Sequence, residues 1–247
     1  MIPTNASLSL ARPILLPLTV ALALLAGCGG NSAPSAPAAP RQEVLVLNDG
    51  GTQDSMIAIL RRDGLNVVAG PLFFNYDTKD IARYAAVVFP CGVQYTKSVP
   101  DSLVPRYVQY VANGGGLVTT DWLAYYRSSY SANFSPLIAA LPAGGYRTRV
   151  TENYSVLLSH RISQGLPSTF AIPATSSYGF TLRDTDAGKS TRVIIAGSTS
   201  GAAVVEGTLG LGKLIHWNTG GNYGGSNPWS VDTRRLFVNM VRYAGGL

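Results

Sequence analysis

Four short segments of this chain carry side chains that could do chemistry, and each follows an apolar run. They are Asn48-Asp49, Cys91-Gly92, Thr120-Asp121-Trp122 and Asn218-Thr219-Gly220. A carboxylate such as that of Asp121 can act as a nucleophile or a general base, and a thiol such as that of Cys91 can act as a nucleophile when a histidine serves as its base. The chain has two histidines for that role, His160 and His216. The side chains of Asp121, Cys91, His160 and His216 are therefore the groups to weigh for a catalytic site.

Each carboxylate also has an ordinary structural role. An aspartate at a strand-to-helix turn, the expected setting of Asp121, commonly caps the helix N-terminus, and we favour that role. Asp49 stands beside Gly50-Gly51, where it suits a turn as well as it suits contact with a polar ligand. Both roles of both carboxylates stay open at the level of sequence.

The thiol and the histidines have structural alternatives too. Cys91 can close a turn as a small apolar residue. His216 lies inside an apolar run, which is typical of a histidine buried in a sheet. His160, at the entry to a loop, is the better candidate for a base, although the same position suits a histidine that only fixes the loop. We expect no metal site and no cofactor, because the two histidines are far apart and neither H-E-x-x-H nor C-x-x-C occurs.

Aromatic residues follow two of these segments. They are Trp122, Tyr125, Tyr126 and Tyr130 in one group, and Trp217, Tyr223 and Trp229 around a loop rich in Asn and Gly in the other. Exposed aromatic rings beside amide side chains suit sugars or a protein partner, and the alternative is packing in the core. The expected ligand-binding residues are Asn48, Asp49, Gly92, Thr120, Trp122, Trp217, Asn218 and Tyr223.

The elements that position these residues alternate between strands and helices. Strands are expected at 44–47, 65–69, 85–89 and 117–120, and helices at 52–63 and 101–112. Uninterrupted apolar strands that alternate with helices predict a parallel sheet covered on both faces. Ligands bind outside the carboxyl ends of such strands, so the four segments should meet at one edge.

The second half of the chain predicts a different arrangement. Apolar runs at 193–196, 202–205 and 214–217 are joined by short Gly-rich turns, which indicates antiparallel strands, and a helix at 231–244 closes the chain. The expected fold is therefore an α/β three-layer sandwich, with a mostly parallel central sheet, helices on both faces and antiparallel strands added near the C-terminus.

Composition excludes several classes. The chain has 247 residues, of which 46% are hydrophobic and 13% charged. Such a chain can bury a core, which excludes a disordered protein. The net charge of +6 is spread out, with no Lys/Arg run longer than two, and this argues against a nucleic-acid partner.

The N-terminal segment predicts a secreted, lipid-anchored protein. The apolar run 14–26 is too short to span a membrane and suits a signal peptide. It ends in Leu25-Ala26-Gly27-Cys28, which resembles the bacterial lipobox, and the alternative is an ordinary secretory signal. We expect a signal peptide at 1–27, a lipidated Cys28 with a Pro/Ala/Gly-rich tether at 28–41, and one domain at 42–247.

The expected location is the bacterial cell envelope. The lipid on Cys28 would anchor the chain to a membrane. Residue 29 is Gly, whereas an Asp there resembles an inner-membrane retention signal, so in a Gram-negative source the outer membrane is favoured.

The order of several motifs resembles the class I glutamine amidotransferase-like fold, and most closely its ThuA-like relatives. The matching stretches are residues 88–92, 113–118, 159–166 (with Arg161 in place of a proline), 212–220 and the closing helix from 232 to 243. The resemblance covers roughly residues 43–245. It implies a flavodoxin-like α/β domain.

One departure from that family limits what the resemblance implies. Working amidotransferases carry a nucleophilic cysteine on a sharp strand-to-helix turn, G-x-C-x-G. Here the equivalent stretch is Val118-Thr119-Thr120-Asp121-Trp122-Leu123, with no cysteine. Glutaminase and cysteine-peptidase chemistry are therefore not expected.

Three hypotheses remain for the function. The first is a non-catalytic, membrane-anchored module that binds a ligand or an envelope protein, the ligand being a carbohydrate in one version. The second is a hydrolase that uses Asp121, Asp49 and His160 on a carbohydrate or acyl substrate. The third is a structural envelope protein that assembles with partners. We rank the binding module first, the structural protein second and the hydrolase third.

Overall fold

The computed structural model describes most of the chain beyond residue 39. The described residues are 40–51, 53–94, 96–120, 122–123, 132–140, 142–147, 151–172, 179–182, 190–197, 201–219 and 229–247. Ala39–Leu247 forms one compact unit. The predictions for Cys28, Asp121 and Tyr223 lie outside the described residues.

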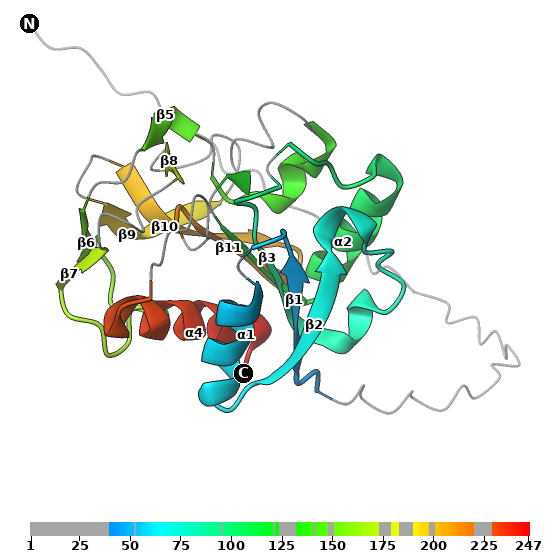
Figure 1. Cartoon of the computed structure of the whole chain (residues 1–247), viewed down its shortest axis with the longest axis horizontal. Coiled ribbons are helices and arrows are strands. Elements are labelled where there is room, and N and C mark those ends of the chain that lie inside the picture. The colour runs from blue at the N-terminus through cyan, green and yellow to red at the C-terminus, as the bar shows by residue number, and fades with distance from the viewer. Residues whose placement is uncertain are drawn as a thin grey trace, which may run out of the picture. The chain divides into compact units, whose positions relative to one another are not determined.

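One half of the central sheet is parallel (Figure 1), as the sequence predicts for its first four strands. The strand predicted at 214–217, β11, was expected among the antiparallel strands; it is antiparallel to β10 but parallel to β4, and so completes this half. Its strands stand in the order β2-β1-β3-β4-β11, and each neighbouring pair is parallel. The strands are β1 (Glu43–Asn48), β2 (Asn66–Leu72), β3 (Tyr84–Phe89), β4 (Gly116–Thr120) and β11 (Gly212–Trp217). Every residue of β3 and β4 is buried, because helices cover both faces of this half.

The other half of the sheet is antiparallel. From β11 it continues through β10 (Gly201–Leu209), β9 (Thr191–Gly197), β6 (Glu152–Val156) and β7 (Thr169–Ile172). A short pair, β5 (Pro142–Arg147) and β8 (Gly179–Leu182), joins through β8 to β10. The sequence predicts β9, β10 and β11 but not β5 to β8. In β6 the exposed Asn153 lies between the buried Glu152 and Tyr154, and in β7 exposed and buried residues alternate, so neither strand has an uninterrupted buried run.

Helices lie on both faces of the sheet. α1 (Gln53–Arg62) and α4 (Val231–Gly245) lie side by side on one face (Figure 1). α2 (Val104–Ala112) covers the other face, together with the short 3-10 helices η1 (Phe73–Asn75), η2 (Ile81–Arg83), η3 (Asp101–Leu103) and η4 (Ala132–Leu137). The predicted three-layer α/β fold is confirmed. No helix in the described part of the chain combines the length and apolarity that a membrane span requires.

The core therefore has two parts, one on each face of the sheet. The α2-side core contains Leu45 and Leu47 from β1, whereas the α1/α4-side core contains Val44 and Val46 from the same strand. Successive side chains of a strand point to opposite faces, so the uninterrupted apolar run of β1 serves both layers at once.

Gln53, the first residue of α1, forms side-chain hydrogen bonds to β1 and β2 where their pairing is irregular. The register of this pair shifts between Val46 and Asn48. The side-chain amide nitrogen of Gln53 donates to Val46 O and to Gly70 O, each at 2.7 Å. The buried amide of Gln53 thus joins β1 to β2 at the point where their register shifts.

Replacing Gln53 by leucine should destabilise the fold. Gln53→Leu keeps the size of the side chain but leaves two carbonyls without this donor, which we expect to cost about 2 kcal/mol of unfolding free energy. Urea unfolding followed by circular dichroism measures this change. Ser55→Ala, at an exposed position of the same helix, is the control and should change stability by no more than about 0.5 kcal/mol. Equal stability of the two variants would contradict the role given to Gln53.

Candidate functional site

The four segments singled out in the sequence meet along the carboxyl edge of the parallel strands. The amide of Gly92 donates to Asp49 Oδ2 at 2.7 Å, and the amide of Trp122 donates to Cys91 O at 2.9 Å. Thr120 at the end of β4 pairs with Trp217 at the end of β11. A continuous row of contacts therefore joins the ends of β1, β3, β4 and β11, as predicted for an open parallel sheet.

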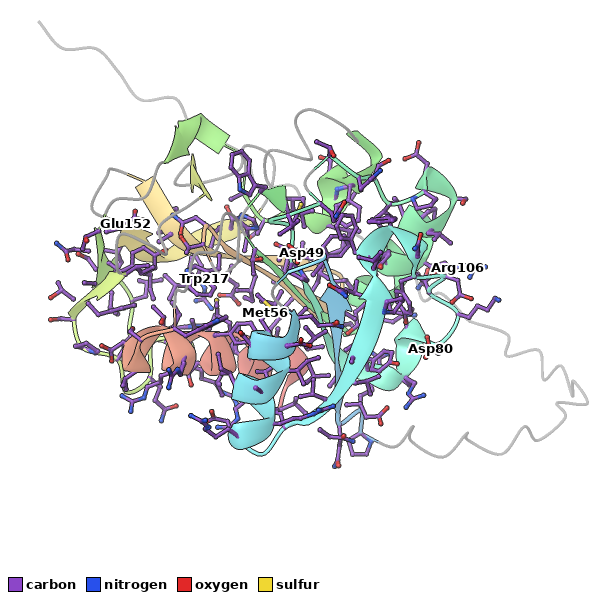
Figure 2. All side chains as sticks on the ribbon, viewed as in Figure 1. Asp49, Met56, Asp80, Arg106, Glu152 and Trp217 are labelled. Carbon is purple, nitrogen blue, oxygen red and sulfur yellow. The ribbon has the colours of Figure 1, made fainter. Side chains whose placement is uncertain are left out.

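Asp49 holds two turns together. Its side chain lies just beyond the end of β1 (Figure 2) and is fully buried. Oδ2 accepts hydrogen bonds from the amides of Gly92 and Val93, at 2.7 and 3.1 Å, and Oδ1 accepts one from Gly51 at 3.2 Å. Of the two roles that the sequence left open, these contacts match the structural one.

Asn48 makes the same kind of local contact. Its Oδ1 accepts a hydrogen bond from the amide of Gly50 at 2.7 Å. Gly50 has a φ of 91°, a conformation that favours glycine. The Asn-Asp-Gly-Gly sequence is thus a turn whose side chains bind its own backbone and the neighbouring turn.

The other predicted residues of this edge are largely inside the protein. Cys91, Thr120 and Trp217 are fully buried, and Trp122 is 6% exposed. Cys91 and Trp122 belong to the α2-side core, and Trp217 belongs to the α1/α4-side core. Both tryptophans therefore pack in the core, which is the second of the roles considered for the aromatic residues.

A buried hydrogen-bond cluster closes the end of β11. The indole nitrogen of Trp217 donates to the hydroxyl of Tyr154 at 3.2 Å, and that hydroxyl donates to Asn218 Oδ1 at 2.5 Å. The hydroxyl of Thr219 also donates to Asn218 Oδ1, at 3.3 Å. Tyr154 comes from β6, a strand without an apolar run, so no sequence signal singled it out. The cluster ties the antiparallel half of the sheet to the carboxyl edge.

His160 belongs to a second polar cluster. Its Nε2 lies 3.6 Å from Glu206 Oε2 and 3.0 Å from Nη2 of Arg192, and its Nδ1 accepts a hydrogen bond from the amide of Ile162 at 3.2 Å. The buried carboxylate of Glu206 also binds Arg192 Nε and the hydroxyl of Tyr243. Burial lowers the pKa of His160, and the nearby carboxylate opposes this only in part.

The second cluster lies away from the carboxyl edge. The ring of His160 packs edge-on against Tyr243 in the last turn of α4, with ring centroids 4.5 Å apart. Lys213, near the start of β11, donates to Tyr243 O at 3.0 Å, so this cluster stands at the amino ends of the parallel strands. The structure does not bring His160 to the described residues that flank position 121.

His216 is fully buried in the middle of the sheet. Its Nδ1 lies 2.7 Å from the hydroxyl of Thr119, and its Nε2 has no hydrogen-bond partner in the described part of the chain. Burial lowers the pKa of His216 to about 3, because the charged form of a buried ring has lost its contact with water and gains no compensating interaction. As for metal ligands, no group of three or more His, Cys, Asp or Glu gathers among the residues that the structure describes.

Comparison with known proteins identifies the fold. No family model matches the chain, and no curated protein does. A solved ThuA-like protein from Bacteroides uniformis has a TM-score of 0.63 at 17% identity, covering 87% of this chain and 95% of its own. A cytoplasmic protein from Salmonella typhimurium has a TM-score of 0.62 at 14% identity, covering 82% and 99%. At these identities the likeness concerns the fold alone.

Two further structures have related folds. A GMP synthase-like protein from Thermoplasma acidophilum has a TM-score of 0.58 at 12% identity, covering 83% of this chain and 95% of its own. A β-galactosidase from Bacillus circulans has a TM-score of 0.61 at 10% identity, with this chain spanning 31% of its length. The chain therefore has the ThuA-like, glutamine amidotransferase-like fold that its motif order predicts.

The buried His216 should make the fold sensitive to acid. Its folded pKa of about 3 lies below the ordinary value of 6.5, so between these values the unfolded chain binds the extra proton and stability falls as the pH drops. The loss should approach about 1.4 kcal/mol per pH unit well below pH 6.5. We expect His216→Leu to show a shallower loss than the unchanged chain in urea unfolding between about pH 7 and about pH 4. His160→Asn, the control at the partly exposed histidine, should alter the slope less. Identical slopes for His216→Leu and the unchanged chain would contradict this prediction.

Proposed function

We propose that this chain is a lipid-anchored, non-catalytic binding module of the bacterial cell envelope with a carbohydrate as ligand. One observation carries the non-catalytic part. The sequence that follows β4, residues 121–131, has no cysteine, and the one cysteine of Ala39–Leu247, Cys91, follows β3 and is fully buried. A buried thiol in an apolar setting is not a nucleophile, so cysteine chemistry of the amidotransferase type has no group to perform it.

The polar groups at the carboxyl edge support the same proposal. The carboxylate of Asp49 accepts three backbone hydrogen bonds, and the side chain of Asn218 is 2% exposed and bonded to Tyr154. A general base has to reach a substrate proton. Groups committed to turns and strand ends suit a rigid platform for a binding surface better than acid–base catalysis.

Residues 121–131 and 220–228 follow β4 and β11, which are neighbours in the sheet. Their sequences contain Tyr125, Tyr126, Tyr130 and Tyr223. Tyrosine rings and amide side chains suit the apolar faces and hydroxyls of sugars. Fold likeness to a ThuA-like protein and to part of a β-galactosidase is compatible with a carbohydrate-related role.

The carbohydrate proposal can be tested with the chain from residue 28 onward carrying Cys28→Ser, which removes the lipid. Titration calorimetry against a panel of envelope and storage polysaccharides should identify a ligand, and Tyr223→Ser should weaken its binding at least about tenfold through loss of a ring contact. Leu211→Ser is the matched control, because Leu211 is 84% exposed and precedes β11. Failure of the whole panel to bind, or equal affinities of the two variants, would reject a carbohydrate site here.

The same titration separates the two other hypotheses. Release of sugar or acyl product from a bound polysaccharide, abolished in a folded Asp121→Asn variant, would replace the binding module by a hydrolase. Co-purification of one envelope protein in place of carbohydrate binding would favour the structural assembly role.

The lipid anchor has its own test. The lipobox-like Leu25-Ala26-Gly27-Cys28 supports lipidation at Cys28. Expressed in a Gram-negative host, the full chain should incorporate labelled palmitate and fractionate with the outer membrane, as Gly29 favours. Cys28→Ser should lose the label and leave the membrane fraction. Cys91→Ala should keep both properties, because Cys91 is buried in the domain. Labelling that persists in Cys28→Ser would exclude this anchor.

A further inference from the structure

The helices α1 and α4 turn a row of exposed arginines toward solvent. The exposed members are Arg61, Arg62, Arg234, Arg235 and Arg242. The acidic residues on the same helices and the turn after α1 are Asp54, Asp63 and Asp232. None of the five arginines forms an ion pair with another described residue. Among the residues that the structure describes, this face therefore has an excess of positive charge that no ion pair neutralises.

Three of these arginines line one hollow. Arg234, Arg235 and Arg242 surround a depression of about 450 Å³ together with Asp63, Gln164 and Asn239. We call it the arginine groove. A guanidinium binds phosphate in a planar, bidentate manner. Three guanidiniums against one carboxylate make the groove suited to a phosphate-bearing ligand.

Backbone contacts hold two of the guanidiniums in place. Arg235 Nη1 donates to Gly165 O, and Arg242 Nη2 donates to Asp63 O at 2.6 Å. The side-chain amide of Asn239 donates to Ile162 O at 3.0 Å, which fixes the opposite wall. Each guanidinium has five N–H donors, so most donors remain for a ligand. Side chains that are already ordered lose less entropy on binding.

The chain enters the domain beside this groove. A second hollow, of about 580 Å³, is lined by Pro40, Arg41 and Gln42 together with Arg242. Arg242 thus stands between the point of entry and the groove. Residues 29–40, which precede the point of entry, are rich in Pro, Ala and Gly. An extended chain of this kind rises about 3.1 Å per residue. The groove is therefore within tens of ångströms of whatever surface holds Cys28.

We propose that the arginine groove docks the domain on the phosphate headgroups of an anionic lipid surface. The charge of the groove complements that surface, and its position beside the tether brings the two together. The groove runs along α4 from Val231 to Arg242. The inference complements the proposed lipid anchor, but the attraction itself needs no lipid on Cys28.

The test uses the chain from residue 28 onward with Cys28→Ser, so that the groove alone can hold it on a vesicle. The chain should sediment with phosphatidylcholine vesicles that contain roughly 30% phosphatidylglycerol, and not with phosphatidylcholine alone. Binding should weaken strongly between about 50 mM and about 500 mM NaCl, because salt screens exposed charges. The triple variant Arg234→Gln, Arg235→Gln, Arg242→Gln should bind at least about fiftyfold more weakly, since each basic residue contributes about fivefold.

A control variant separates the groove from net charge. Lys79→Gln, Lys97→Gln, Arg106→Gln removes the same charge from exposed positions away from α1 and α4, with Arg106 on α2 at the far side of the domain (Figure 2). It should bind nearly as well as the unchanged chain. Equal loss in both triple variants, equal sedimentation with both vesicle types, or binding of inorganic phosphate without vesicle binding would each overturn the proposal. Palmitate labelling of Cys28 is independent of all these outcomes.

Discussion

The inner strands of the parallel half of the sheet are buried on both faces, and most other features of the molecule follow from that constraint. β3 and β4 have no exposed residue, so each needs apolar side chains on both faces and a helix layer above and below. The helices pack very close to the sheet backbone. A Cβ on Gly116 would clash with the backbone of Ala244 in α4, and a Cβ on Gly212 would clash with Val111 O in α2. Close packing against both helices fixes the centre of the fold.

The same burial explains why the polar residues at the carboxyl edge are committed to internal bonds. A buried donor or acceptor without a partner costs free energy. At this edge the strands end, and the backbone groups beyond them no longer pair with a neighbouring strand. Asp49 supplies acceptors to three amides, Asn218 receives the hydroxyl of Tyr154, and Gln53 supplies donors to two carbonyls. The edge is consequently a rigid platform, and the ligand contacts that we propose come from the segments that begin on it.

The charged residues of α4 and its surroundings fall into two sets. The buried carboxylate of Glu206 joins Arg192 of β9 to Tyr243 of α4 and stands beside His160, so it holds the antiparallel strands to the closing helix. The exposed arginines of the same helix form no ion pair with another described residue. The first set of charges stabilises the domain, and the second is the set that we propose to bind the headgroups of an anionic lipid surface.

The sequence by itself determined the elements with apolar runs or clear helical spacing, which are β1 to β4, β9 to β11, α1, α2 and α4. The order of its motifs indicated the fold. It missed β5 to β8, and β6 and β7 are short strands in which exposed residues interrupt the buried ones. Only the tertiary structure decided the role of Asp49. An aspartate beside two glycines suits a turn or a ligand equally, and the choice depends on Gly92, which lies 43 positions away. The burial of Trp122 and Trp217 was likewise undetermined, because an aromatic side chain packs in a core or on a ligand by the same apolar surface.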